Sequence, residues 1–391
     1  MLPRCVLVAW AALATASYGL NILMTNEDGF AAANIRELYK QLTGLGHNCY
    51  IVAPATDQST DPSRTLFSTD SKLTTDSEWD ILKAGAPAIG TDPQDDHIWY
   101  YNGTPAAQVL VALDYVLPNF AKFQVPDLVI SGPNSGWTLG PFVYTLAGSI
   151  GATIAAMERG IPAISLSSGN TDSIPFTWVN ASTKVGLDDP ATITARLATS
   201  LIQAMVDKAK GSPILPRGYG VSVNMPFITS YSSDKCTNPP FILTRMAPST
   251  SDRAVYDKTT GLFHSSPDAS ATSENSHGDD LPAERDVVAS SCMSSVTVFA
   301  LEFDPSFHGM CVNISDVTAL VPLIVQVNGS IVPDGPGNGT VVVVGNSSQP
   351  SKPDGDAPAP PPMTTITGMG AKTQMSLSAL LLGAGVVAAL L

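Results

Sequence analysis

Three loops of small, oxygen-bearing residues lie far apart in the chain, and each contains or directly follows a short apolar run typical of a β-strand. They are Thr25 to Phe30, Ala53 to Ser59 and Pro126 to Gly136. In an open α/β sheet, the loops at the carboxyl ends of parallel strands meet at one edge, where ligands bind. The sequence therefore predicts an α/β fold whose functional site is built from these loops.

The spacing of apolar residues supports this fold class. A strand is predicted at Asn21 to Thr25, a helix with one apolar face at Ala31 to Leu45, and a second strand at His47 to Ala53. Such a βαβ unit predicts a parallel sheet with a right-handed crossover. Helices are predicted further on at 106–117, 144–159 and 191–210, and strands at 127–130, 163–167, 220–224 and 296–303. Residues 60–96 are interpreted as a loop with a small hairpin, and residues 231–291 are left unassigned.

Four side chains of the three loops are suited to a metal ion. Glu27 and Asp28 are adjacent carboxylates, which repel each other unless a cation or protons lie between them. Together with Ser59 and Asn134 they form an all-oxygen donor set of the kind that hard divalent cations prefer. Three of them have an ordinary explanation when taken alone: Asp28 caps a helix, Ser59 is a loop serine and Asn134 lies in a turn.

The same loops carry a family resemblance. Thr25 to Gly29, Ala53-Pro54 with Gln58-Ser59, Gly103-Thr104-Pro105 and Pro126 to Gly136 occur in the order found in one family, and Gly148 to Met157 with Gly160 to Ala163 match its later helix and strand. This ordered set resembles the SurE-like survival-protein phosphatases, which act as 5′/3′-nucleotidases. The resemblance covers about Leu20 to Asn224 and extends more loosely to Phe303.

The resemblance implies a Rossmann-like, mostly parallel sheet with helices on both faces, and a C-terminal β extension that often supports homodimers. It also implies hydrolysis of phosphate monoesters such as nucleoside monophosphates. Mg²⁺ or Mn²⁺ is expected on Glu27, Asp28, Ser59 and Asn134, with Glu27 and Asp28 as the catalytic residues. Backbone N–H groups at helix starts bind phosphate, and the residues expected to bind phosphate or substrate are Asn26, Gly132, Gly148 and Ser149.

Two departures from the family pattern leave an alternative open. The family's first acid is usually Asp, whereas this chain has Glu27, and the loop Gly136 to Phe142 lacks the family's two neighbouring Asp residues. A cell-surface protein that keeps the fold with weak or no turnover is therefore a second hypothesis.

A third hypothesis is a serine hydrolase. The segment Ala147 to Gly151 approximates the nucleophile elbow of α/β-hydrolases, with Ser149 as the nucleophile. An elbow must follow a strand, and residues 144–146 are poorly suited to one.

The two ends of the sequence predict export and anchoring. Residues 1–19 contain one basic residue, a short apolar run and a small-residue exit, which is typical of a signal peptide. A phosphatase domain is predicted at 20–326 and a Gly-, Pro-, Asn- and Ser-rich glycosylated stalk at 327–367. Residues 368–391, with small residues, a polar spacer and an apolar tail, match a GPI-attachment signal, and a tail-anchored helix is the alternative. The protein is therefore expected to be secreted or held at the plasma membrane by a lipid anchor.

Glycosylation motifs, charge and cysteines agree with this location. N-glycosylation triplets begin at Asn102, Asn180, Asn313, Asn328, Asn338 and Asn346. The net charge of −14 argues against a nucleic-acid partner, which needs a basic surface. Without the signal peptide four cysteines remain, and they allow three complete pairings. Cys49 is interpreted as a buried free thiol, and Cys292 with Cys311 is the expected disulfide.

Overall fold

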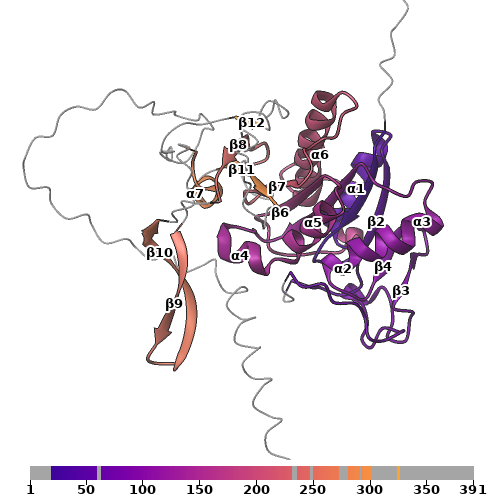
Figure 1. The fold of residues 1–391 in the computed structure, drawn as a ribbon, viewed down its shortest axis with the longest axis horizontal. Helices are drawn as coiled ribbons and strands as arrows, with labels where there is room; N and C mark the ends of the chain where they lie inside the picture. Colours follow the sequence, from indigo (N-terminus) through magenta and orange to yellow (C-terminus); the bar gives the residue numbers. More distant parts are fainter. Residues whose placement is uncertain are drawn as a thin grey trace, which may run out of the picture. The chain divides into compact units, whose positions relative to one another are not determined.

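The computed structural model describes residues 19–59, 63–230, 236–246, 250–272, 281–290, 292–301 and 324–325. In these residues ten strands form one sheet: β1 (Asn21–Thr25), β2 (Asn48–Pro54), β3 (Ile89–Asp92), β4 (Asp95–Tyr101), β5 (Leu128–Ser135), β6 (Ala163–Ser168), β7 (Tyr219–Met225), β8 (Phe241–Thr244), β11 (Ser294–Ala300) and β12 (Ile324–Val325). Their order across the sheet is β12-β8-β11-β7-β6-β5-β1-β2-β4-β3 (Figure 1). A separate hairpin consists of β9 (Thr250–Asp257) and β10 (Leu262–Thr272).

The centre of the sheet is parallel, as predicted. The strands β7, β6, β5, β1, β2 and β4 all pair in parallel, so their carboxyl ends lie at one edge. The direction changes at β3, which is antiparallel to β4, and at β11, which is antiparallel to β7. The strands β8, β11 and β12 form the predicted C-terminal β extension.

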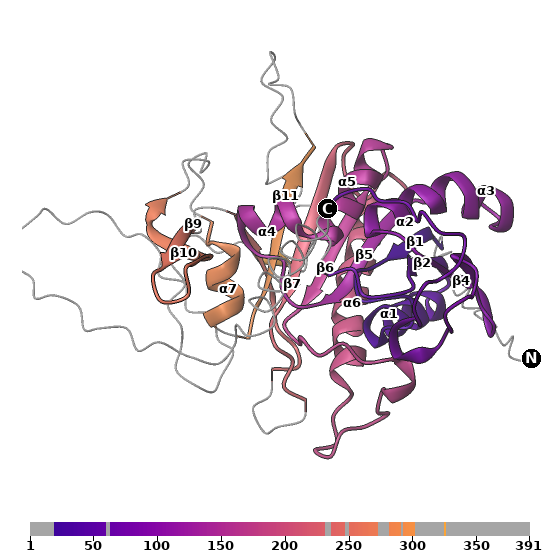
Figure 2. The ribbon, with the colours of Figure 1, turned by 90° about the horizontal axis from the view of Figure 1, so that it is seen from below.

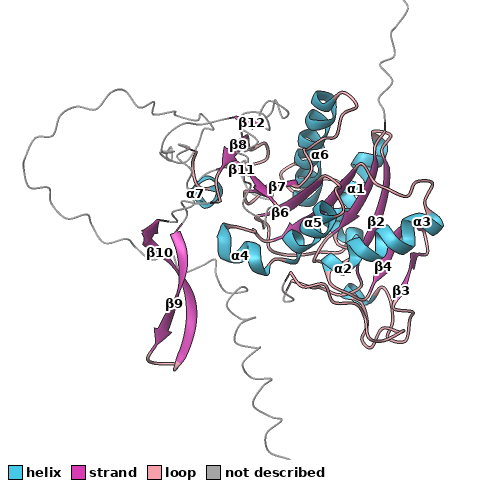
Figure 3. Ribbon diagram, viewed as in Figure 1, coloured by secondary structure: helices cyan, strands magenta, loops and turns pink. Residues whose placement is uncertain are grey.

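Helices lie between many of the strands in chain order, and Figure 3 distinguishes the two kinds of element by colour. They are α1 (Ala33–Gly44), α2 (Pro105–Val111), α3 (Leu117–Phe120), α4 (Gly140–Leu146), α5 (Gly148–Glu158), α6 (Pro190–Ala209) and α7 (Glu284–Ser290), with a π-helical turn, η2 (Ala112–Val116), between α2 and α3. Single 3₁₀ turns occur at η1 (Glu78–Asp80) and η3 (Phe176–Trp178). Figure 2 shows the same elements from below.

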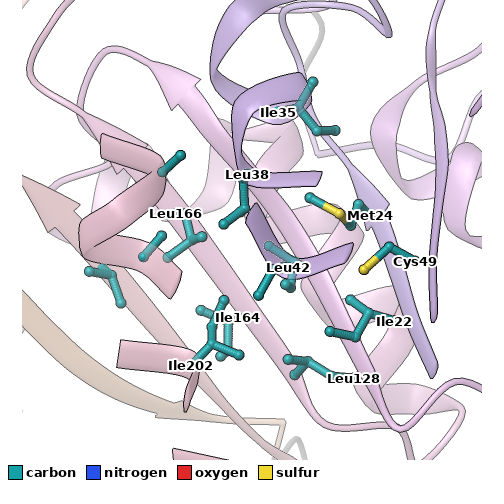
Figure 4. Packing of buried hydrophobic residues seen from close by; sticks show 14 of the residues in the cluster. Ile22, Met24, Ile35, Leu38, Leu42, Cys49, Leu128, Ile164, Leu166 and Ile202 are labelled. Carbon is teal, nitrogen blue, oxygen red and sulfur yellow. The ribbon is translucent and has the colours of Figure 1, made fainter. Parts of the chain in front are cut away.

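The central sheet is covered on both faces, because successive side chains of a strand point to opposite sides. Ile22 and Met24 of β1 join a buried cluster with residues of α1 and α6 (Figure 4). Leu23, between them, joins a second cluster with residues of α2 and α5. This arrangement confirms the Rossmann-like fold class.

Some predicted elements differ from the observed ones. The single helix predicted at 144–159 is two helices, α4 and α5, because Ala147 between them has an extended backbone. The hairpin predicted within 60–96 is β3 with β4, and β4 also pairs with β2 in the main sheet. The unassigned segment 231–291 contains β8, β9, β10 and α7.

The predicted disulfide between Cys292 and Cys311 is wrong. Cys292 bonds to Cys236, with the two Cα atoms 5.4 Å apart. Because β8 and β11 are neighbouring parallel strands, the segments that lead into them start at the same edge of the sheet. The backbone N–H of Ser294 donates to the Pro240 carbonyl at 2.8 Å, which holds these segments together. Cys311 lies outside the described residues, and Cys49 is a buried free thiol, as predicted.

Several predicted features of the two ends also lie outside the described residues. They are the signal peptide apart from Gly19, nearly all of the region from 302 onward with its stalk and GPI signal, and the triplets at Asn313, Asn328, Asn338 and Asn346. Asn180 is described and lies exposed after η3. In the described part of the chain, no helix is both long enough and apolar enough to cross a bilayer.

Candidate metal centre at the carboxyl edge of the sheet

The turn after β1 presents Glu27 and Asp28 at the carboxyl edge of the sheet. Asn26 closes this turn, because its Nδ2 donates to the Gly29 carbonyl at 2.9 Å and its Oδ1 accepts from the Gly29 N–H at 3.2 Å. Gly29 has a φ of +111°, which favours glycine. Asn26 is fully buried, and the nitrogen and the oxygen of its side-chain amide both form hydrogen bonds within the turn. In this structure Asn26 therefore has a positioning role.

Asn134 joins this turn from the neighbouring strand. Because β5 pairs with β1 in parallel, the end of β5 lies beside the turn. Asn134 Oδ1 accepts from the Glu27 N–H at 2.8 Å, and the N–H of Ser135 donates to Asp28 Oδ2 at 2.9 Å. Three of the four predicted metal ligands, Glu27, Asp28 and Asn134, are thus held together by hydrogen bonds.

The first turn of α5 contacts the side chain of Glu27. The N–H of Ser149 donates to Glu27 Oε1, and a helix N-terminus favours such a carboxylate. A Cβ added to Gly148 would lie 2.9 Å from Cγ of Pro105 and 3.4 Å from Cγ of Glu27. The close approach of these groups requires glycine at 148. The N–H predicted to receive a substrate phosphate therefore bonds to Glu27 in this structure.

The loop after β2 reaches the same turn. The N–H of Gln58 donates to the Glu27 carbonyl at 2.9 Å. The next residue, Ser59, is exposed, and its hydroxyl donates to Asp57 Oδ1 at 2.5 Å. Among the hydrogen bonds of the described residues, Ser59 has none to Glu27 or Asp28. Ser59 therefore borders the cluster, and its role as a metal ligand stays a prediction.

Asp57 is an acid of this site that the sequence reasoning missed. Its negative charge raises the pKa of both Glu27 and Asp28, in addition to the larger effect of burial. The signal was available in the sequence, because Asp57 stands two residues before Ser59 in the same loop.

The electrostatics of the cluster fit a bound cation. Burial and then the charge of Asp57 raise the pKa of Asp28 to about 7, against the opposing hydrogen bond from Ser135. Burial also raises the pKa of Glu27, with the Ser149 N–H opposing it. Within the part of the chain that the structure describes, none of these acids forms an ion pair. Buried carboxylates without a positive partner are unfavourable, and a divalent cation would supply that partner.

The donor chemistry sets a condition on that cation. Among the residues that the structure describes, there is no group of three or more His, Cys, Asp and Glu side chains that could hold a metal ion by itself. A cation here therefore depends on oxygen from Asn134 or Ser59 beside the two acids, as Mg²⁺ and Mn²⁺ permit. Asn134 Nδ2 is buried without a hydrogen-bond partner, which leaves one donor available to a ligand.

Two other predicted residues have structural roles. Gly132 has a φ of +117°, and a Cβ there would come within 2.1 Å of the Leu166 carbonyl oxygen. It allows β5 to pack closely against β6. Ser149 is fully buried, and its hydroxyl lies 3.4 Å from Oγ1 of Thr138. The element before Ser149 is helix α4 instead of the strand that a nucleophile elbow needs, so the serine hydrolase hypothesis is wrong.

The loop between β5 and α4 is fixed by hydrogen bonds to the end of β7. Asn224 at the end of β7 bonds both sides of the Thr138 backbone, accepting from its N–H at 2.8 Å and donating to its carbonyl at 2.9 Å. Trp137 Nε1 donates to the Met225 carbonyl at 2.7 Å. The strand β7 therefore holds the loop that leads from Asn134 to α4.

Glu284 of α7 holds the start of α4. Its carboxylate accepts from the Gly140 N–H at 2.6 Å, from Oγ1 of Thr297 at 2.8 Å and from the Tyr144 hydroxyl at 3.3 Å. Burial raises the pKa of Glu284 to about 7. This carboxylate comes from the segment that the sequence left unassigned, where no pattern signalled it.

Comparison with known proteins finds similar sequences. The family model described as survival protein SurE matches residues 22–252. An acid phosphatase of Yarrowia lipolytica is 40% identical over 290 residues, which cover 72% of this chain and 80% of that protein. A 5′-nucleotidase SurE of Desulfovibrio desulfuricans is 34% identical over 149 residues, which cover 38% of this chain and 49% of that protein.

A solved structure is also similar. The crystal structure of the SurE protein from Aquifex aeolicus has 19% identity and a TM-score of 0.48, covering 73% of this chain and 94% of that chain. The match to the family model spans more than half of the sequence, and the match to the Yarrowia protein spans more than two thirds. The chain belongs to the survival protein SurE family.

Proposed function

We propose that the protein is a phosphomonoesterase, an acid phosphatase or 5′/3′-nucleotidase, that depends on Mg²⁺ or Mn²⁺. Membership of the SurE family and the likeness to an acid phosphatase support the class of reaction. The observation that carries the proposal is the hydrogen-bonded cluster of Glu27, Asp28 and Asn134 at the carboxyl edge of the sheet. Ser59, on the facing loop, is proposed as the fourth ligand.

The chemistry of the cluster suits a phosphate ester. Glu27, Asp28 and Asn134 would hold a divalent cation, which would polarise a phosphoryl oxygen and make a water molecule easier to deprotonate. The protein contributes the positions of its own groups: Ser149 N–H orients the Glu27 carboxylate, and Ser135 N–H orients that of Asp28. Asn134 Nδ2, buried without a partner, is available to donate to a phosphoryl oxygen.

Secretion to the cell surface is part of the proposal. The bridge between Cys236 and Cys292 supports an oxidising compartment, and the exposed Asn180 supports glycosylation. Attachment by a GPI anchor and assembly into a homodimer stay predictions.

Phosphate release tests the proposed function. The purified protein is assayed with p-nitrophenyl phosphate and AMP between pH 4 and 8, with Mn²⁺, with Mg²⁺ and with EDTA. We expect release with a metal ion, loss in EDTA and recovery when the ion is restored, whereas Asp28→Asn releases little under any condition. Release that persists in EDTA would contradict the metal role. No release at any pH would favour the inactive cell-surface protein.

A further inference from the structure

A row of hydroxyl side chains crosses the central sheet. Six neighbouring strands each contribute one hydroxyl, and all six side chains are buried. The strand register places them opposite one another in the order Thr25 (β1), Ser131 (β5), Ser165 (β6), Ser222 (β7), Thr297 (β11) and Thr244 (β8). We call this set the hydroxyl row. Its first member, Thr25, stands two positions before Glu27 of the candidate metal centre.

The hydroxyl row lies on the face of the sheet that α5 covers. Val129 and Ala163 belong to the buried cluster that includes Ala152 of α5. Ser131 and Ser165 stand two positions further along the same strands, so they point to the same side as Val129 and Ala163. Paired residues of neighbouring strands project to one face, and the other members of the row therefore share it. The row is enclosed between the sheet and its helices.

Three neighbouring members of the row have unpaired hydroxyl groups. Among the described residues, Oγ1 of Thr25 and Oγ of Ser131 and of Ser165 are buried without a hydrogen-bond partner. Each of these residues is 0% exposed. An unpaired buried hydroxyl is unfavourable, and an apolar side chain such as alanine would avoid that cost. Three unpaired hydroxyls side by side therefore indicate that a polar ligand lies between them.

The spacing of the strands suits water as that ligand. Neighbouring strands lie about 4.8 Å apart. This separation is too long for a direct bond between opposite hydroxyls, which needs about 2.8 Å. A water molecule slightly off the line between two such oxygens can reach both of them. Buried waters typically make about three hydrogen bonds to polar groups that have no other partner.

The hydroxyl row reaches Glu284 at its other end. Oγ1 of Thr297 donates to Glu284 Oε2 at 2.8 Å and lies 2.8 Å from Oγ1 of Thr244. The Tyr144 hydroxyl donates to the same carboxylate at 3.3 Å. Burial and the charge of Glu284 raise the pKa of Tyr144. Hydrogen bonding with Ser222 and Thr297 lowers that pKa, so Tyr144 connects Glu284 to the row as well.

Glu284 is a titratable group enclosed by these hydroxyls. It is 0% exposed, and burial raises its pKa to about 7. The titratable groups that act on it are Tyr144 of α4 and Arg285 of its own helix. The strands β7, β8 and β11, on which α7 packs, contain no Asp, Glu, Lys, Arg or His, and Arg245 after β8 accepts from the Glu284 N–H through its carbonyl at 2.9 Å. A proton that enters or leaves this carboxyl group therefore passes through the neighbouring hydroxyls.

We propose that the hydroxyl row binds a file of internal water molecules and that this file is a proton path between Glu284 and the candidate metal centre. A proton leaves the Glu284 carboxyl group for a neighbouring hydroxyl. Each hydroxyl and water along the row then accepts one proton and gives one away. The net change is one proton moved to a water molecule at the Thr25 end of the row, and a carboxylate that the Gly140 N–H stabilises at 2.6 Å. The inference goes beyond the proposed function, because the path requires no phosphate ester.

A crystal structure that resolves ordered waters tests the binding site. Wild type is compared with Ser165→Ala and with Ser230→Ala, a matched control that removes a buried unpaired hydroxyl outside the row. We expect ordered waters bonded to Ser131 and Ser165 in wild type and in Ser230→Ala. The water bonded to the hydroxyl at 165 should be lost in Ser165→Ala. A wild-type map without water density beside Ser131 and Ser165 would overturn the proposal.

The rate at which Glu284 exchanges its proton tests the path. Stopped-flow infrared spectroscopy follows the protonated carboxyl band after mixing with D₂O at pH 5, where Glu284 is protonated because its pKa is about 7. Glu284→Gln identifies the band. We expect exchange to be about tenfold slower in Ser131→Ala and in Ser165→Ala, which is the effect on a rate of losing roughly one hydrogen bond. Ser230→Ala should exchange at the wild-type rate.

The outcomes of the exchange experiment separate this inference from the proposed function. Equal exchange rates in wild type, Ser131→Ala and Ser165→Ala would show that protons reach Glu284 by another route and would overturn the path. Slower exchange in both variants supports the path even if the protein releases no phosphate, because the measurement needs neither metal nor turnover.

Discussion

Asn134 Oδ1 accepts a hydrogen bond of 2.8 Å from the backbone N–H of Glu27. The two residues are 107 positions apart in the chain and lie on neighbouring parallel strand ends. The bond fixes the turn that carries Glu27 and Asp28 relative to β5.

Gly148→Ala should displace Glu27. The added Cβ would lie 2.9 Å from Pro105 and 3.4 Å from Glu27, so one of these groups must move. Because small misplacements at a reaction centre can lower rates about a hundredfold, we expect kcat/KM to fall by ~10–100-fold. Gly44→Ala is the control, since apart from its chain neighbours and the backbone of its own helix no atom lies within 4 Å of its Cβ position, and it should leave kcat/KM unchanged. Equal activity of the two variants would contradict the role given to Gly148.

Asn224→Ala should release the loop between β5 and α4. It leaves the buried N–H and carbonyl of Thr138 without their partners at 2.8 Å and 2.9 Å. Each unpaired buried group costs roughly 1–3 kcal/mol, so the free energy of unfolding should fall by at least about 2 kcal/mol. Urea denaturation measures this change, with the exposed Asn119→Ala as control. If both variants unfold at the same urea concentration as wild type, Asn224 does not hold the loop.

Glu284 should make the protein more stable in acid. Its pKa is raised by burial from 4.5 to about 7, so the folded state binds the proton more tightly than the unfolded state. The stabilisation by Glu284 is complete below pH 4.5 and is lost as pH rises through about 7. Over this range the free energy of unfolding should fall by about 3 kcal/mol. In Glu284→Gln the part of the pH dependence that is due to Glu284 should disappear, while the part due to Asp28 and Glu27 remains; the exposed control Glu158→Gln should keep both parts. Urea titrations at pH 4.5, 6 and 8 measure the free energy of unfolding of wild type and the two variants. Identical pH profiles for all three proteins would contradict the role given to Glu284.

The bridge between Cys236 and Cys292 should stabilise the C-terminal part of the sheet. The two cysteines are 56 positions apart, and closing a loop of that length stabilises a protein by about 4 kcal/mol. The double variant Cys236→Ser/Cys292→Ser should lower the free energy of unfolding by about that amount. Peptide mapping without reductant should find the linked peptides in wild type and in Cys311→Ser. A peptide that links Cys292 to Cys311 would contradict the structure.

The central sheet could be predicted from the sequence because its strands are short apolar runs separated by helices with one apolar face. The cluster could be predicted for a related reason, since parallel strands bring Glu27, Asp28 and Asn134 to one edge whatever the details of the loops. The spacing of apolar residues indicates the fold class, and the fold class in turn predicts that the loops carrying Glu27, Asp28 and Asn134 lie at one edge of the sheet.

The remaining features depend on contacts between distant segments. The pairing of β8 with β11, and with it the Cys236–Cys292 bridge, leaves no local pattern in the chain. Glu284 acts through Gly140, which is 144 positions away. The break at Ala147 was missed although Gly148 and Ser149 are weak helix formers, because residues 144–157 form one run of small and apolar residues.

Manganese anomalous scattering tests the central claim most directly. A crystal of the protein is soaked in Mn²⁺, and an anomalous difference map is calculated for wild type and for Asp28→Ala. We expect one strong peak bounded by the oxygens of Glu27, Asp28 and Asn134, with Ser59 as the nearest residue of the facing loop, and no peak there in Asp28→Ala. A wild-type map with no peak among these side chains, or with the ion bound elsewhere in the molecule, would contradict the account.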